Sequence, residues 1–125
     1  MDVAFLEDGG IEFIISRDGI TMRFRIANPF KYGIDSWRFI RNGGMSSTRY
    51  DGCKMSSTPA NMSLIFYEDS QIGTYQIVRL KEGFLELSIE LELSNKSRFA
   101  KSSIRVPLVD CYNCIDKLIE QFESV

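Results

Sequence analysis

Histidine is absent from this chain of 125 residues, and cysteine occurs only three times. Without histidine, the chain lacks the commonest general base, the serine–histidine and cysteine–histidine nucleophile pairs and the usual ligand of transition metals. A closed zinc site needs four ligands, which three cysteines do not supply. An odd number of cysteines fits a reducing compartment better than a disulfide framework. We therefore expect no catalytic residues, no metal site and no cofactor.

Long hydrophobic runs and a targeting segment are also missing. No apolar run approaches the roughly 20 residues that a membrane-spanning helix needs. The first ten residues carry Asp2, Glu7 and Asp8 in place of the basic and apolar regions of a signal peptide. We therefore expect a cytoplasmic protein without membrane contact. Apolar residues at 44% and charged residues at 26% are typical of a globular protein, so residues 1–125 are expected to form a single domain.

The first clear secondary-structure signal is a hairpin. Residues 11–15 and 20–26 alternate between apolar and polar side chains, which is typical of strands with one buried face. Asp18-Gly19 between them predicts a type I′ turn, because this turn needs positive φ at both positions. The turn fixes the register, with these residues opposite each other: Ile15 and Met22, Phe13 and Phe24, Ile11 and Ile26, Glu12 and Arg25. Every large apolar residue except Ile14 then lies on one face.

A three-strand meander follows later in the chain. Residues 85–93 alternate leucine or isoleucine with glutamate or serine, a pattern that a helix would scatter around its axis. Turns at Glu82-Gly83 and Asn95-Lys96 predict these pairs: Leu80 and Leu85, Val78 and Leu87, Leu91 and Ala100, Leu87 and Ile104, Leu85 and Val106. On the other face Glu86 lies between Arg79 and Arg105, and Glu90 lies beside Lys101. We expect this face to be solvated and charge-paired rather than catalytic.

The chain ends in a predicted amphipathic helix after Pro107. Asp110 is the expected N-cap, and the apolar stripe follows the i, i+3, i+4 spacing with Cys111, Cys114, Ile115, Leu118, Ile119 and Phe122. Residues 63–67 are expected to form one more strand. Residues 27–61 are not assigned, because 35–41 fits either a short helix or a strand. The predicted fold is therefore α+β, with an antiparallel sheet of six to eight strands and one C-terminal helix.

The pair Cys111 and Cys114 matches the C-x-x-C motif of redox proteins. A helix N-terminus can lower the pKa of such a thiol. A redox site of the thioredoxin type, however, follows a parallel strand in a βαβ unit, and here an antiparallel meander precedes the motif. We therefore expect both thiols to be reduced and packed in the core.

Two surfaces are candidates for binding. The first is the polar face of the meander, where aromatic residues stand among acids that could attract a basic partner: Tyr75, Glu86, Glu90, Glu92 and Phe99. The alternative lies in the basic segment 17–54, which holds eight bases and three acids and includes Trp37, Arg38, Arg41, Arg49 and Tyr50. Aromatic and basic residues together can stack on single-stranded nucleic acid, although the net charge of −2 disfavours attraction to phosphates.

The layout of a small, histidine-free antiparallel sheet with a charged meander and a helix from Pro107 to Phe122 resembles the bacterial immunity proteins of contact-dependent or polymorphic toxin systems. This resemblance implies a cytoplasmic, non-enzymatic inhibitor that neutralises a toxin domain by stoichiometric protein–protein binding. Two alternatives stay open: a nucleic-acid or anionic-ligand binding module that uses segment 17–54, and a small enzyme that uses the sheet carboxylates. Neither the partner nor the oligomeric state follows from the sequence.

Overall fold

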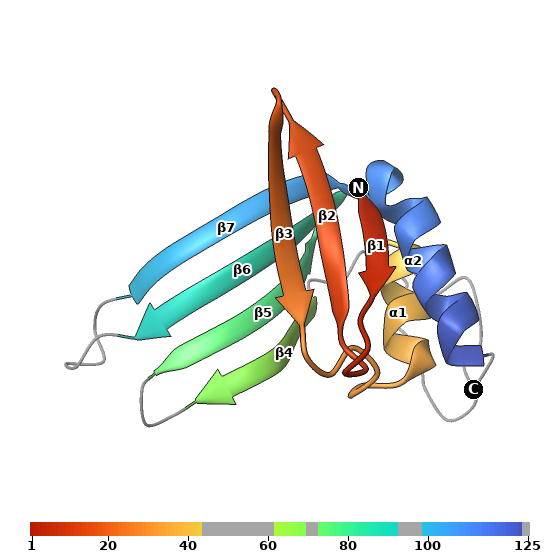
Figure 1. Ribbon diagram of the computed structural model, residues 1–125, viewed down its shortest axis with the longest axis horizontal. Coiled ribbons are helices and arrows are strands. Elements are labelled where there is room, and N and C mark those ends of the chain that lie inside the picture. The colour runs from red at the N-terminus through yellow and green to blue at the C-terminus, as the bar shows by residue number, and fades with distance from the viewer. Residues whose placement is uncertain (44–61, 70–72, 93–98, 124–125) are drawn as a thin grey trace.

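The computed structural model describes residues 1–43, 62–69, 73–92 and 99–123, except for the side chains of Met62 and Phe99. Within these ranges the chain forms seven strands and two helices, so the fold is α+β with antiparallel strands, as predicted. The strands form two sheets, one of three strands and one of four, rather than the single sheet expected (Figure 1).

The smaller sheet contains β1 (Asp2–Phe5), β2 (Ile11–Arg17) and β3 (Ile20–Ile26), in that order. The register of β2 and β3 is the predicted one, with Phe13 opposite Phe24. Asp18 and Gly19 have φ angles of 52° and 77°, so the expected turn is confirmed. Strand β1 was not predicted, because its four residues are too few to show a clear alternation.

The larger sheet contains β4 (Met62–Asp69), β5 (Thr74–Lys81), β6 (Phe84–Glu92) and β7 (Phe99–Pro107), in chain order. The meander registers are confirmed: Leu80 is opposite Leu85 and Leu87 is opposite Ile104. The expected turn at residues 95–96 lies outside the described residues. Strand β4 confirms the strand expected at residues 63–67.

The helices are α1 (Ile34–Arg41) and α2 (Leu108–Glu123). Helix α2 confirms the C-terminal helix, and its stripe is buried at Cys111, Cys114, Ile115 and Leu118. The expected N-cap is wrong, because the helix already begins at Leu108, directly after Pro107. Helix α1 resolves the ambiguity at residues 35–41 and corrects the expectation of one helix. Gly43, with a φ of 68°, follows its last turn, where a glycine commonly ends a helix.

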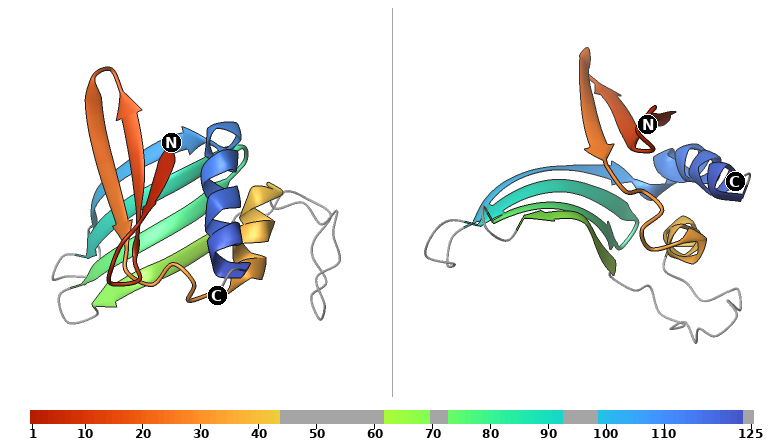
Figure 2. Two further views of the ribbon diagram at one scale, coloured as in Figure 1. Left: turned by 45° about the vertical axis from the view of Figure 1, so that its right-hand side comes forward. Right: turned by 60° about the horizontal axis from the view of Figure 1, so that its bottom comes forward.

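Both sheets and both helices share one hydrophobic core. Trp37 of α1 lies where the sheets meet. Its ring stacks on the ring of Phe66 of β4, with 5.6 Å between the ring centroids. It forms an edge-to-face contact with Phe13 of β2, with 6.2 Å between the centroids. Figures 1 and 2 show α2 beside β1, with α1 next to it. Neither helix of the described part of the chain is long and apolar enough to cross a membrane.

The four-stranded sheet is arched. Figure 2 (right) shows hairpin β2–β3 standing on the convex side of the arch. Leu87 of β6 lines a crevice together with Met22 and Phe24 of the hairpin, so the alternating row of Leu85, Leu87 and Ile89 lies on this side. The hairpin covers only part of this side. Ile89 is therefore 50% exposed, although it lies on the same face of β6 as the buried Leu87. Met22 is 37% exposed, although it lies on the same face of β3 as the buried Phe24. The apolar rows are thus only partly buried, because the hairpin crosses the sheet instead of lying flat on it.

Candidate functional site: the concave face of the four-stranded sheet

The polar side chains of the meander lie on the inside of the arch, which we call the concave face. The register brings residues from three neighbouring strands onto it. They are Tyr75, Ile77, Arg79 and Lys81 of β5, Phe84, Glu86, Ser88, Glu90 and Glu92 of β6, and Lys101, Ser103 and Arg105 of β7. A concave surface makes neighbouring side chains converge, so their charges interact strongly.

Glu86 lies at the centre of this face and is only 1% exposed. Four cations surround its carboxylate: Arg105 Nε at 3.0 Å, Lys101 Nζ at 3.0 Å, Arg79 Nη1 at 3.5 Å and Lys81 Nζ at 3.6 Å. Burial alone would raise the pKa of Glu86, but hydrogen bonds from Lys101 and Arg105 and the charges of Lys101 and Lys81 lower it from 4.5 to about 2. Glu86 is therefore an ionised, structural carboxylate.

Glu90 has a similar environment. It is 8% exposed, pairs with Arg79 and accepts a hydrogen bond of 2.7 Å from Ser88 Oγ. The hydrogen bond from Arg79 lowers the pKa of Glu90 against the opposing effect of burial. The expected pairing of Glu86 with Arg79 and Arg105 is thus confirmed, whereas Glu90 is opposite Lys101 but forms its ion pair with Arg79. The expectation of a solvated face is wrong for both glutamates. Their neighbours on the inside of the arch shield them from water.

The exposed charge around Glu86, at the centre of the concave face, is consequently positive. The side chains of Arg105, Lys81 and Lys101 are 62%, 42% and 37% exposed, whereas that of Glu86 is 1% exposed. Four cations surround two buried carboxylates, which leaves two more positive than negative charges around Glu86. Two further acids, Glu92 and Glu68, lie at the Tyr75 end of the face. The site predicted from the sequence contained the acids but not these bases, although the predicted register already placed Arg79, Lys101 and Arg105 beside the acids.

Aromatic residues flank the charged centre. At one end Tyr75 is partly exposed, and its hydroxyl donates a hydrogen bond of 3.2 Å to Glu92 Oε2. This bond raises the pKa of Tyr75, because ionisation would place two negative charges together. At the other end Phe84 is 44% exposed. The side chain of Phe99 lies outside the described residues, so its contribution stays a prediction.

In the alternative surface of the basic segment, the described candidates Trp37, Arg38 and Arg41 all contact other parts of the protein. Trp37 is fully buried, and its indole N–H donates a hydrogen bond of 2.7 Å to the carbonyl of Pro29. Arg38 pairs with Glu123, and Arg41 pairs with Asp116 of α2 at 2.9 Å. Residues 49 and 50, the other candidates Arg49 and Tyr50, lie outside the described residues. Among the described candidates of this surface, Trp37 therefore offers no exposed ring, and Arg38 and Arg41 are paired with acids.

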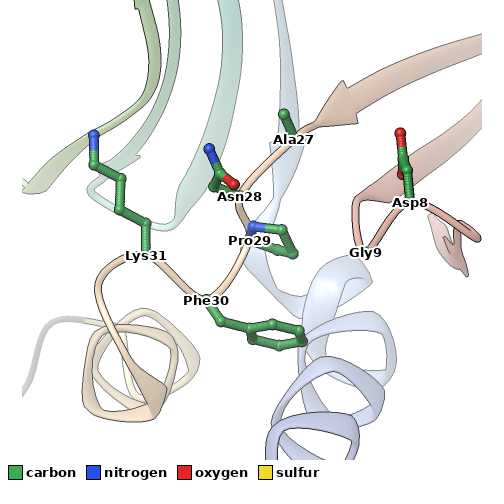
Figure 3. Close-up of a pocket in the computed structure, with 7 residues that line it drawn as sticks. All are labelled: Asp8, Gly9, Ala27, Asn28, Pro29, Phe30 and Lys31. Carbon is green, nitrogen blue, oxygen red and sulfur yellow. The ribbon is translucent and has the colours of Figure 1, made fainter.

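A depression of about 430 Å³ lies between the β1–β2 turn and the segment after β3 (Figure 3). It is lined by Asp8, Gly9, Ala27, Asn28, Pro29, Phe30 and Lys31. Both charged side chains are engaged elsewhere: Asp8 pairs with Arg25, and Lys31 donates to the carbonyl of Ile65. Figure 3 shows Asp8 and Lys31 far apart, on opposite sides of the depression. Their separation does not favour joint binding of one ligand.

The two cysteines of the C-x-x-C pair are buried and free, as predicted. Burial raises the pKa of Cys111 to about 11 and that of Cys114 to about 12, so both thiols are protonated at neutral pH. A redox-active pair needs a thiolate. Among the described residues, no group of three or more acids and cysteines is placed to hold a metal ion.

Comparison with known proteins gives no relative: no protein family model, curated protein or solved structure matches the chain.

Proposed function

We propose that the protein is a binding protein of the immunity type, which neutralises a toxin domain by forming a stoichiometric complex with it. The concave face is its proposed binding surface. The observation that carries this proposal is the ionic centre at Glu86, where four cations are held in place by a buried carboxylate and flanked by Phe84 and Tyr75. Fixed charges beside exposed aromatic rings are typical of protein interfaces.

The charges of this face indicate the character of the partner. Glu86 and Glu90 are shielded, while Arg105 and Lys81 reach the solvent. The exposed cations favour an acidic surface on the part of the partner that meets the centre of the face, rather than the basic one that the sequence suggested. Complementary charge of this kind mainly raises the rate of association and the specificity.

Two observations weigh against the alternative functions. An enzyme that uses the sheet carboxylates would need one with a pKa near neutral, whereas the pKa values of Glu86 and Glu90 are lowered. A nucleic-acid binding module would need exposed aromatic rings for stacking, whereas Trp37 is buried and Arg38 and Arg41 pair with acids of α2.

The product of the neighbouring upstream gene is the first partner to test, because an immunity gene must be inherited together with its toxin gene. We expect size-exclusion chromatography with light scattering to show a complex with one copy of each protein. We also expect co-expression of this chain to abolish the toxicity of that product. A product that stays toxic, or that does not form a complex at micromolar concentrations, would contradict the proposal.

A further inference from the structure

Strand β7 is the last strand of the larger sheet, and its backbone is accessible along one side. It pairs with β6 alone in the described part of the sheet, and residues 100–103 are all exposed. The opposite edge of the sheet differs. There β4 is interrupted by an irregularity between Ile65 and Tyr67, and the carbonyl of Ile65 already accepts hydrogen bonds from Tyr32 and Lys31. Such features protect an edge against a further strand. Strand β7 has a regular register with β6 from Phe99 to Pro107, and Arg17 occupies its Arg105 carbonyl near the end of the strand.

One hydrogen bond shows which backbone groups of β7 face outward. Arg17 of β2 donates to the carbonyl of Arg105 at 2.8 Å, so this carbonyl points away from β6. In an antiparallel strand the N–H and C=O of one residue point to the same side, and this side alternates along the chain. The backbone groups of Lys101 and Ser103 therefore face the same open side as those of Arg105.

A strand added at this edge would have different surroundings on its two faces. On the concave side it would meet the side chains of Lys101 and Arg105. On the convex side it would meet a crevice of about 240 Å³ between the hairpin and the sheet, whose lining includes Met22, Ile89 and Ile104. The side chain of Ser103 points to the concave side, so only its backbone can line this crevice. The crevice thus reaches the open backbone of β7.

We infer that the β7 edge accepts an extended segment of another protein, in which acidic residues alternate with apolar ones. The acids would face Lys101 and Arg105, and the apolar side chains would enter the crevice. Charge disfavours a second copy of this chain, because antiparallel pairing of two β7 strands about Ser103 would place Lys101 opposite Arg105 of the copy. This inference rests on the proposed function for the class of partner, and it adds the mode of recognition, strand addition to a sheet edge.

The probe is a capped synthetic peptide of the same length as β7 that alternates glutamate with valine. We expect it to slow amide hydrogen exchange at Lys101, Ser103 and Arg105 in the full chain. A peptide with lysine in place of glutamate should not bind. Ser103→Pro removes an N–H that points outward and does not pair with β6. An edge strand tolerates a proline at such a position. The loss of this hydrogen bond should weaken binding of the glutamate peptide about tenfold or more. Ser103→Ala keeps the N–H and should bind like the unchanged chain.

Three results would overturn the inference. The first is equal binding of the glutamate and lysine peptides, and the second is binding of the glutamate peptide without protection of the three amides. The third is dimerisation of the chain at micromolar concentrations that Ser103→Pro abolishes, which would assign the edge to a second copy. If Ser103→Pro does not fold, the unchanged chain is tested instead with a glutamate peptide whose backbone amides are N-methylated at every second residue. This peptide cannot donate the hydrogen bonds of an added strand and should fail to bind. This assay needs no natural partner, so its outcome is independent of the test with the upstream gene product.

Discussion

Lys101 donates a hydrogen bond of 3.0 Å to Glu86, although Glu90 is the residue opposite Lys101 in the strand register. Glu90 pairs with Arg79, from the strand on the other side of β6. The two carboxylates of β6 thus connect it to β5 and to β7 at once, through contacts that run diagonally across the sheet.

Replacing Glu86 with glutamine should destabilise the protein and flatten its response to acid. Because the folded-state pKa of Glu86 is about 2, below its ordinary value of 4.5, the ionised carboxylate stabilises the fold above pH 4.5, and this stabilisation is lost as the pH falls toward 2. The shift corresponds to about 3 kcal/mol. Urea unfolding at pH 7 and pH 3 should show a smaller difference between the two pH values for Glu86→Gln than for the unchanged chain.

A suitable control is Glu120→Gln on the exposed side of α2. It should leave the free energy of unfolding at both pH values nearly unchanged. If Glu86→Gln and Glu120→Gln have the same pH dependence, the ionic centre does not stabilise the folded state.

Truncation of Tyr75 should weaken binding to the partner more than it weakens the fold. Tyr75 is partly exposed, and aromatic anchors of this kind often contribute about 2 kcal/mol or more to an interface. Calorimetry with the identified partner should therefore show this loss for Tyr75→Ala. Tyr75→Phe keeps the ring and gives up only the hydrogen bond to Glu92, so it should bind nearly normally. Normal binding by Tyr75→Ala would exclude this end of the concave face from the interface.

Charge changes on the concave face should act mainly on the association rate. Lys81→Glu removes an exposed cation and should slow association with an acidic partner by about threefold or more at low salt. Glu92→Lys should have the opposite effect, because it adds to the positive charge. Stopped-flow measurements at two ionic strengths would test both. Slower association for Glu92→Lys would point to a basic partner instead.

Cys111 and Cys114 should resist modification while the protein is folded. Both are fully buried, and their pKa values of about 11 and 12 leave almost no thiolate at pH 8. In a chain with Cys53→Ser, reaction with a thiol reagent should be slow and should accelerate on unfolding in urea. Replacing either buried cysteine with alanine should cost about 1 kcal/mol of stability, with the partner still bound. Rapid modification of the native protein would contradict the burial.

The fluorescence of Trp37 should not respond to single-stranded DNA. This residue is the only tryptophan of the chain and has no exposed surface. Stacking on bases would therefore require the core to open. Unchanged emission, together with weak quenching by iodide, is the expected result. Strong quenching by DNA at low salt would favour the nucleic-acid alternative.

The parts of the fold that the sequence predicted are those that local patterns determine. Strands β2 and β3 were assigned with the correct register because Asp18-Gly19 fixes the turn. A register shifted by one residue would also move every apolar side chain of a strand to the other face of the sheet. The stripe of α2 was predicted because its spacing repeats over several turns of the helix. In contrast, β1 is too short for a pattern, and α1 was ambiguous because its eight residues fit two periodicities.

The candidate site was predicted only in part, for a tertiary reason. Alternation assigned Glu86 and Glu90 to the polar face of the sheet, which is confirmed. It could not indicate that the sheet arches and that the inside of the arch shields these carboxylates while Lys81 and Arg105 stay exposed. The sign of the exposed charge at the centre of the face therefore differs from the sign that the residue types suggested.

The packing of β1 against α2 also has a consequence for biosynthesis. Asp2 of β1 pairs with Lys117 of α2 across 115 residues of sequence, and α2 lies beside β1 in Figure 1. The first sheet therefore leaves the ribosome long before the helix that covers its flank has been synthesised. Contacts of such long sequence separation form late and slow folding. During translation the nascent sheet would expose Val3 and Phe13 to solvent, which makes it a candidate substrate for ribosome-associated chaperones.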